Sequence, residues 1–406
     1  MPLQIIAVRL LLIATAFSAL PAMAADAHAQ QIGEELASRL TEAQTRAYIF
    51  YLRAHAQYRR DADAYWSAVD DLREQRRRKR SSGRPFSPSD YVAVQPPRYQ
   101  GPSLPADVAK IIASLRPARP EEKPEPMPGV ADFLTHARTL YRFVPAPTSE
   151  AVFKRRYAEE ALSLGLSKDQ VVRVYALETG GRGTYDMQAG IDPESKRGTP
   201  ISSALGYAQL LGANSVSELV RHGEGFAQRL EVLAASPGNG RVRAQLLAKA
   251  TAVRRMVRAA RSVPNVWSAH VAMSRTPKGL GIHALNLDAD IGPWLQAVKL
   301  RGIRDHAEKA GRMHLSGAEI ELMNLAGPQT GLDMMEPAGR DAPTANFFSR
   351  KAYDRNPIVK DKTSAELLAA LESRMDQNIR KPGSGEFARG FDAALAAHAR
   401  AAAFRR

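Results

Sequence analysis

Cysteine is absent from the 406 residues of this chain. Its absence excludes disulfide bonds and thiol chemistry, and a chain of this length can bury a core without covalent cross-links. The nine histidines show no His-Glu-x-x-His or other metal-ligand spacing, and no glycine-rich phosphate loop follows a strand-like run. We therefore expect the chain to use neither a metal nor a cofactor.

Long apolar runs are also scarce. The run from Leu10 to Leu20 is shorter than the roughly 20 residues that a membrane-spanning helix needs. It follows Arg9 and precedes Pro21-Ala22-Met23-Ala24, the layout of a secretory signal with an Ala-x-Ala cleavage site. We expect residues 1–24 to be removed, leaving Ala25 first and no transmembrane segment, whereas cleavage after Ala27-His28-Ala29 would leave Gln30 first. An uncleaved membrane anchor is the alternative. The prediction is a periplasmic or secreted protein, and export to a periplasm is compatible with the lack of cysteine.

The charge balance is strongly basic, with a net charge of +15. Much of the excess lies in the run Arg76-Arg77-Arg78-Lys79-Arg80 and around Arg400, Arg405 and Arg406. Nucleic acid is the usual partner of so basic a chain. For an exported protein we instead expect anionic envelope polymers to bind the basic run and no nucleic acid to bind. The alternative is a basic surface that only contacts solvent.

Three regions follow the predicted signal. In residues 25–75, small and apolar residues recur in steps of three and four, which predicts one long amphipathic helix or a helix pair that packs on the chain itself or forms a coiled coil. Residues 76–128 are rich in proline and arginine and predict an extended linker or surface strap, interrupted by a short helix at Ala106 to Leu115.

The rest of the chain is predicted to be mainly helical. We expect an α-rich domain over residues 129–360 and a helical extension over 361–406, with little β-structure, near Asp186–Gln209. The expected helices are Val130–Tyr141, Ser149–Leu162, Lys168–Glu178, Val216–Leu219, Phe226–Ala234, Val242–Arg261, Ile291–Leu300, Ser316–Leu325, Ser364–Ile379 and Glu386–Ala403.

One glutamate stands out at a predicted helix end. Ser167-Lys168-Asp169-Gln170 reads as a capping box, and Val171, Val174, Tyr175 and Glu178 share one face of the helix that follows. Gly180, Gly181 and Gly183 then stop the helix. Burial and the negative end of the helix dipole both disfavour the carboxylate anion, so the pKa of Glu178 should rise, as a general acid near neutral pH requires. The alternative is a helix-end glutamate paired with Arg173 or Arg182.

Three segments in order resemble one enzyme family. Glu178-Thr179-Gly180, then Ala204-Leu205-Gly206-Tyr207-Ala208-Gln209, then Met323-Asn324-Leu325-Ala326-Gly327-Pro328 look like the motifs of the lysozyme-like lytic transglycosylases. The resemblance covers roughly Glu150 to Met335. Thr179 stands where serine is usual, Met323 replaces an aromatic residue, and the interval before the third segment is long. The resemblance implies an α-rich lysozyme-like fold and Glu178 as the catalytic residue. The substrate-binding residues implied with it are Thr179, Ser202, Ser203, Gly206, Tyr207, Gln209 and Asn324.

The family cleaves the glycan strands of peptidoglycan with a single glutamate. That residue protonates the glycosidic oxygen and then takes the proton of the muramyl C6 hydroxyl, which closes a 1,6-anhydro ring. A glycosidase ordinarily uses two carboxylates, and the nearby candidates for a second one are Asp186, Asp192 and Glu194. We expect a lytic transglycosylase. The alternatives are a muramidase that uses water, with Asp186 or Asp192 as base, and a non-catalytic peptidoglycan-binding or scaffold protein.

Overall fold

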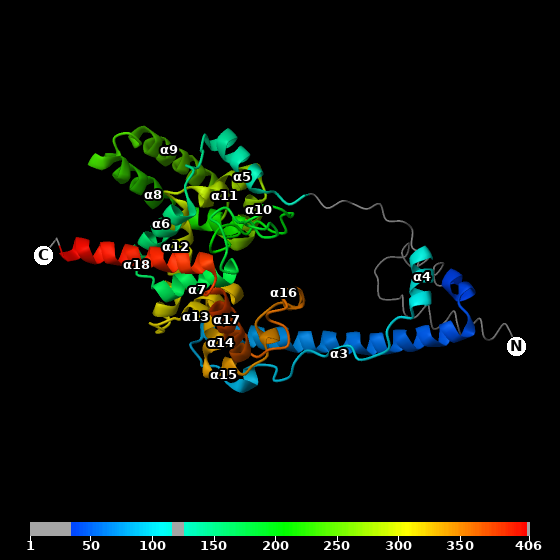
Figure 1. Cartoon of the computed structure of the whole chain (residues 1–406). Helices are drawn as coiled ribbons and strands as arrows, with labels where there is room; N and C mark the ends of the chain where they lie inside the picture. The colour runs from blue at the N-terminus through cyan, green and yellow to red at the C-terminus, as the bar shows by residue number, and fades with distance from the viewer. Residues whose placement is uncertain (1–33, 116–125, 404–406) are drawn as a thin grey trace. The chain divides into compact units, whose positions relative to one another are not determined.

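The computed structural model describes residues 34–115 and 126–403, so the predicted signal segment and the last arginines lie outside the described residues. What it describes is mainly helical, as predicted (Figure 1). The chain divides into two compact units. Unit 1 comprises Met1–Pro124 and Ala342–Lys362, and unit 2 comprises Glu125–Asp341 and Thr363–Arg406. Among the described residues no helix is long and apolar enough to cross a membrane.

Unit 1 is built on one long helix, α3 (Glu42–Ser81), as the apolar spacing predicts. Thr41 caps its start in a capping box with Gln44. A single turn, η1 (Pro88–Asp90), and a second helix, α4 (Ala106–Leu115), lie in the proline-rich region. Helix α4 has the predicted bounds. It packs through Val108 on a small apolar cluster that contains Leu36, Leu40 and Tyr48.

The basic run is helical, and the prediction that the linker begins at Arg76 is wrong. Helix α3 continues through the run to Ser81 because two of its cations are held by the chain itself. The guanidinium of Arg76 is buried and donates hydrogen bonds to the carbonyls of Asp90 (2.6 Å) and Asn346 (2.7 Å). The ammonium of Lys79 pairs with the Asp90 carboxylate at 2.6 Å. The other three basic side chains of the run, Arg77, Arg78 and Arg80, are exposed.

Residues 342–362 belong to unit 1 and not to the catalytic region where the sequence boundaries put them. This segment contains η5 (Thr344–Asn346) and α16 (Arg350–Arg355). The Asn346 amide both accepts from the Val92 backbone N–H (2.8 Å) and donates to the Val92 carbonyl (2.9 Å). These bonds, with those of Arg76, attach the segment to residues more than 250 positions earlier. Such pairings leave no periodic signal in the sequence.

Unit 2 contains the remaining helices. They are α5 (Val130–His136), with a π-helical turn η2 (Ala137–Tyr141) after it, α6 (Glu150–Ser163), α7 (Lys168–Glu178), α8 (Gly212–Ala235), η3 (Pro237–Asn239), α9 (Arg243–Ala260), α10 (Trp267–Ser274), α11 (Pro277–His283), η4 (Ala284–Leu287), α12 (Gly292–Lys309), α13 (Gly317–Ala326), α14 (Pro328–Met335), α15 (Pro337–Arg340), α17 (Ser364–Asn378) and α18 (Pro382–Ala403). Within the described ranges, β-structure is limited to the isolated bridges Gln188–Leu205, Ile191–Gly198 and Leu205–Leu210. The bridges lie where the sequence predicts the little β-structure.

Helix α8 joins the two expected helices Val216–Leu219 and Phe226–Ala234 and runs through Gly223 between them. Gly223 does not break the helix, because α9 approaches it closely. A Cβ at this position would lie 2.3 Å from a methyl carbon of Val257. The glycine therefore serves close helix packing and not a turn, a use that residue type alone does not reveal.

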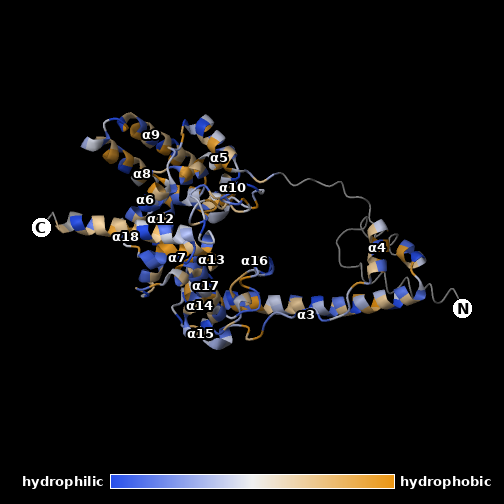
Figure 2. Ribbon diagram, in the orientation of Figure 1, coloured by the Kyte–Doolittle hydropathy of each residue, from blue (hydrophilic) through white to orange (hydrophobic). Residues whose placement is uncertain are grey.

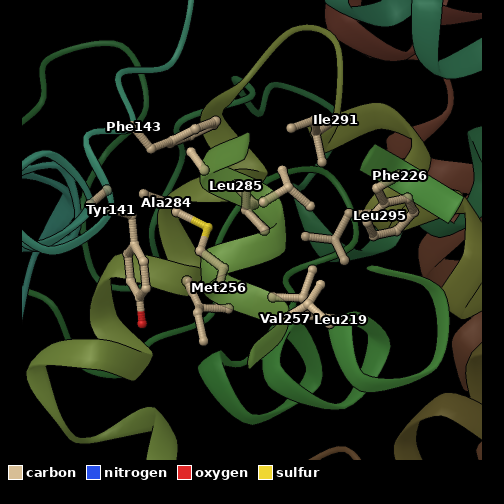
Figure 3. Packing of buried hydrophobic residues seen from close by; sticks show 14 of the residues in the cluster. Tyr141, Phe143, Leu219, Phe226, Met256, Val257, Ala284, Leu285, Ile291 and Leu295 are labelled. Carbon is tan, nitrogen blue, oxygen red and sulfur yellow. The ribbon is translucent and has the colours of Figure 1, made fainter. Parts of the chain in front are cut away.

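Two apolar cores hold unit 2 together. The first lies among α5, α8, α9, α11 and α12 and includes Leu219, Val257, Leu285 and Leu295 (Figure 3). The second lies among α6, α7, α12, α13 and α18. In the hydropathy view the helices of unit 2 mix apolar and polar residues along their length, as helices with one buried face do (Figure 2).

The last helices are part of unit 2. Phe387 and Phe391 of α18 are buried in the second core, where Phe387 contacts the rings of Tyr157 and Tyr175 at centroid distances of 5.4 and 5.3 Å. Helix α17 packs on α7 and α13. Residues 363–406 thus do not form an appended extension, because they supply part of the core that supports α7.

Candidate active site

Glu178 is the last residue of α7, as predicted. The capping box is present: the Ser167 hydroxyl accepts from the Gln170 backbone N–H (3.2 Å), and the Gln170 side chain accepts from the Ser167 N–H (3.0 Å). Gly180 and Gly181 follow with φ of 61° and 73°, left-handed values that end the helix. The Glu178 side chain is partly exposed.

A second carboxyl group lies beside Glu178 and comes from α13. Glu321 is only 4% exposed, and its carboxyl hydrogen-bonds with that of Glu178. One turn later on α13, the amide of Asn324 contacts both carboxyls. Its Nδ2 lies 3.3 Å from Glu178 Oε1 and 3.2 Å from Glu321 Oε1. The first and third motif segments, 146 residues apart, therefore meet at this carboxyl pair.

Two further charged groups from other helices act on this pair. The positive charge of Lys299, on α12, favours the ionised forms of both carboxyls. Burial lowers the pKa of Lys299, and the negative charges of Glu321, Glu178 and Glu218 partly oppose this. Glu218, on α8, is itself buried, and burial raises its pKa. The site thus carries more acidic than basic groups in a region of low solvent access.

The carboxyl pair retains a proton more strongly than ordinary glutamates do. Burial raises the pKa of Glu178, and the Lys299 charge and a hydrogen bond from Glu321 partly offset the effect. Burial also raises the pKa of Glu321, and repulsion from Glu178 raises it further, to well above its usual value. Two adjacent buried carboxyls cannot both ionise cheaply, so they share a proton. The direction of the shift at Glu178 agrees with the sequence prediction.

Sequence reasoning missed Glu321. It lies within a helix that was predicted, Ser316–Leu325, and precedes Asn324 by three positions, so both face the same side. The three-residue spacing from Glu321 to Asn324 on a predicted helix was the sequence signal that could have identified Glu321. The second carboxylate was instead sought close to Glu178 in the sequence.

The three nearby carboxylates have other partners. Burial alone would raise the pKa of Asp186, but hydrogen bonds from Lys196 (2.8 Å) and Thr184 (2.6 Å) lower it. Asp192 accepts from the Ser195 backbone N–H at 2.7 Å and shapes a turn. Glu194 is exposed.

The alternative in which Glu178 pairs with Arg173 is also weakened. The two ion pairs of Arg173 are with Asp169 (2.8 Å) and Asp376 (2.7 Å).

The loop of the second motif segment is held by its own polar groups. The Ser202 hydroxyl accepts from the Ala204 N–H (3.1 Å) and the Ser203 hydroxyl from the Gly212 N–H (3.1 Å). Gln209 has a φ of 41° and donates to the carbonyls of Gly206 (2.8 Å) and Met187 (3.3 Å). Ser202, Ser203 and Gln209 therefore maintain the shape of the loop. Any contact that they make with a sugar is additional to this role.

Gly206 and Thr179 are packed against the protein itself. Gly206 has a φ of 77°, and a Cβ there would lie 2.6 Å from Nε2 of Gln296 on α12. The close approach expected at this glycine is thus to α12 and not to the Glu178 helix. Thr179 is buried and donates its hydroxyl proton to the Tyr175 carbonyl at 2.7 Å, which completes the end of α7.

Tyr207, which the resemblance implies as a substrate-binding residue, lies in the core. It is 1% exposed, its hydroxyl donates to the Glu150 carboxylate, and its ring contacts those of Tyr175 (4.9 Å) and Phe153 (5.3 Å). Of the eight predicted site residues, the structure brings Glu178 and Asn324 into contact, and it shows the other six mainly in supporting contacts.

A buried serine–histidine pair nearby is structural. His283 Nδ1 lies 2.8 Å from the Ser215 hydroxyl, and its Nε2 lies 2.7 Å from the Ser203 carbonyl. Burial lowers the pKa of His283 to about 4, so the ring is neutral near pH 7. Both side chains are fully buried, which excludes a nucleophilic role and leaves them to fix the loop backbone at Ser203.

No group of three or more metal-ligating side chains occurs in the part of the chain that the structure describes. No protein-family model, curated protein or solved structure matches the chain. The function therefore has to be argued from the site itself.

Proposed function

We propose that the chain is an exported enzyme that cleaves the glycan strands of peptidoglycan as a lytic transglycosylase, with Glu178 as acid and then as base. The observation that carries this proposal is the contact of the Glu178 and Glu321 carboxyls with one another and with Asn324. Burial raises the pKa of Glu178, at the position where the resemblance puts the catalytic acid, which is the direction that a general acid requires.

In this reaction Glu178 first gives a proton to the substrate and then takes one back from it. Glu178, the more exposed of the two carboxyls, donates its proton to the glycosidic oxygen, and the bond from that oxygen to the muramyl C1 breaks. The resulting carboxylate then accepts the proton of the C6 hydroxyl as its oxygen bonds to C1. The leaving sugar departs with a free hydroxyl, the other product ends in a 1,6-anhydro ring, and Glu178 regains its proton. No water is consumed.

Glu321 would act through Glu178. Neutral Glu321 donates a hydrogen bond to the Glu178 carboxylate that forms in the first step. Because two adjacent carboxylates repel one another, the two residues do not ionise together. Lys299 favours the anion that forms in between. In this cycle the pair of carboxyls holds two protons before Glu178 acts as acid, one proton after that step, and two again after Glu178 has acted as base.

The arrangement also bears on the muramidase alternative. Inverting glycosidases hold their carboxyls about 6.5–9.5 Å apart to admit water, and retaining ones hold them about 5–5.5 Å apart around the anomeric carbon. Glu178 and Glu321 are hydrogen-bonded to one another and are therefore closer together than in either class of glycosidase. This favours the reaction in which one carboxyl does both steps.

Mass analysis of peptidoglycan after incubation with the purified protein tests the proposal. The expected products end in 1,6-anhydro sugars, and Glu178→Gln should lower the rate by at least about 10²–10⁴-fold. Glu194→Gln removes an exposed carboxyl of the same unit and is the matched control. Reducing ends would mean that water attacks, and intact strands would favour the binding or scaffold function. Full activity in Glu178→Gln would refute the assignment.

A further inference from the structure

Unit 1 carries a row of half-buried aromatic rings that its packing does not cover. Tyr51, His55 and Tyr58 lie on successive turns of α3, and Tyr99 contacts all three at centroid distances of 6.4, 5.3 and 5.5 Å. The Tyr99 hydroxyl donates to the Pro102 carbonyl at 2.6 Å, which fixes this ring against the helix. In unit 2, by contrast, Tyr157, Tyr175 and Tyr207 are fully buried. The rings of unit 1 are therefore ordered but accessible.

A cavity of about 360 Å³ occurs in unit 2, and one of about 310 Å³ lies beside this aromatic row in unit 1. The walls of the unit 1 cavity are aromatic or proline, and its rim is charged. The walls are Tyr58, Trp66, Tyr99, Tyr353, Pro96 and Pro97. Its volume is at the lower end of the range of about 300–1,000 Å³ for ligand pockets. Aromatic rings and prolines lie beside charged groups in this lining, a combination that suits a small ligand with one apolar face and polar edges.

The charged groups at the rim include both donors and acceptors. Arg98 pairs with Asp361 at 2.8 Å, Lys360 lies 3.8 Å from Asp354, and Arg350 also lines the cavity. Hydroxyl groups donate and accept, so a polyhydroxylated ligand can use both kinds of partner. The carboxylates of Asp354 and Asp361 would repel a phosphate backbone. A proline-rich peptide has few polar side-chain groups that could bind the charged groups at the rim.

The cations at the rim are already in ion pairs within unit 1. Besides the pairs of Arg98 and Lys360, Arg350 pairs with Asp63 at 2.7 Å. Among the described residues, the rim therefore offers paired charges to the polar edges of a ligand and has no unpaired cation for an anionic group. The cations of the cavity in unit 2, Arg156, Arg229 and Lys249, are likewise in ion pairs with Asp290 and Glu160.

We propose that the aromatic cavity of unit 1 is a second glycan-binding site, which holds a sugar ring of a polysaccharide against Tyr58 and Tyr99. The C–H face of the sugar packs on the rings, where apolar surface is removed from water. The hydroxyls of the sugar bind the charged rim. The choice of peptidoglycan as that polysaccharide rests on the proposed function, whereas the site itself is separate from Glu178 and needs no cleavage. Its effect is to keep the enzyme on its polymer between cleavage events.

Binding of the full chain to isolated sacculi tests this site. The Glu178→Gln protein is used as the background, so that the polymer is not degraded. Adding Tyr58→Ala or Tyr99→Ala should weaken binding roughly two- to tenfold each, and Tyr58→Phe should retain it because the ring remains. Phe50→Ala is the matched control, since Phe50 is an aromatic residue of the same helix with 65% of its surface exposed and is not part of the cavity wall. Thermal unfolding of each variant checks that unit 1 is folded.

The outcomes separate this site from the catalytic proposal. Unchanged binding in folded Tyr58→Ala and Tyr99→Ala would overturn the inference even if the wild-type protein cleaves glycan. A ring-dependent affinity for sacculi would support it even if cleavage is never seen. Tighter ring-dependent binding of single-stranded DNA or of a proline-rich peptide than of sacculi would overturn it in favour of that ligand.

Discussion

Replacing Glu321 with glutamine should change how the stability of the protein depends on pH. In the wild-type protein, burial and the neighbouring Glu178 raise the pKa of Glu321 well above its usual value. In the unfolded chain a glutamate ionises near pH 4.3. Between that pH and the folded-state pKa, the native state holds one proton more than the unfolded state. The contribution of Glu321 is therefore complete below about pH 4.3 and is lost as the pH rises.

The magnitude follows from the linkage relation. Each retained proton costs about 1.4 kcal/mol of unfolding free energy for every pH unit. If the pair keeps its proton from pH 5 to pH 7, the wild-type protein loses about 2.7 kcal/mol over this range relative to Glu321→Gln. The glutamine has no such proton to retain. The hydrogen bonds that the substitution alters change the unfolding free energy equally at pH 5 and at pH 7. The change in stability between the two pH values therefore reports only the proton that Glu321 retains.

The measurement is the unfolding free energy of wild type and variant in denaturant at several pH values from 5 to 7. The Glu321→Gln curve should rise relative to wild type with pH, whereas Glu194→Gln should follow wild type, because it removes an exposed carboxyl. Parallel stability curves for wild type and Glu321→Gln would refute the shared-proton pair.

Four further predictions concern other parts of the chain. Arg76→Met should destabilise unit 1 by roughly 2–5 kcal/mol, because two buried carbonyls lose their hydrogen-bond donor. Arg77→Met should lower the free energy of unfolding by less than about 1 kcal/mol, because Arg77 makes an exposed ion pair. Equal effects in thermal unfolding would contradict the burial of Arg76. Gly206→Ala should cost at least about 1–2 kcal/mol at a φ of 77°, and Gly302→Ala, in open space on α12, should not destabilise, as calorimetry can check. His283→Gln should remove a loss of stability that the wild type suffers as the pH falls from about 6.5 to about 4, because the folded-state pKa of His283 is lowered to about 4; unchanged acid unfolding would argue against it. N-terminal sequencing of the exported protein should return Ala25 or Gln30, and a sequence that begins before Ala24 would exclude cleavage there.

The sequence by itself determined the features that arise from neighbouring residues. The capping box at Ser167, the buried face of α7 and the glycines after Glu178 are local patterns, and the structure has each of them where predicted. The same is true of the long helix α3 and of α4, whose starts and spacing depend on residues a few positions apart. Local hydrogen bonds and helical periodicity are sufficient for such features.

Only the tertiary structure decided which of these elements meet. The contact of Glu178 with Glu321 and Asn324 joins residues more than 140 positions apart, and it required α7 and α13 to pack side by side. Tyr207 is likewise in the core, where its hydroxyl donates to Glu150 of α6. In unit 1, the Arg76 guanidinium binds the carbonyl of Asp90 and that of Asn346, which is 270 positions away. The residue type and its neighbours in the sequence limit the chemistry that a side chain can perform. Burial and long-range partners set its pKa, and both depend on which helices pack against one another.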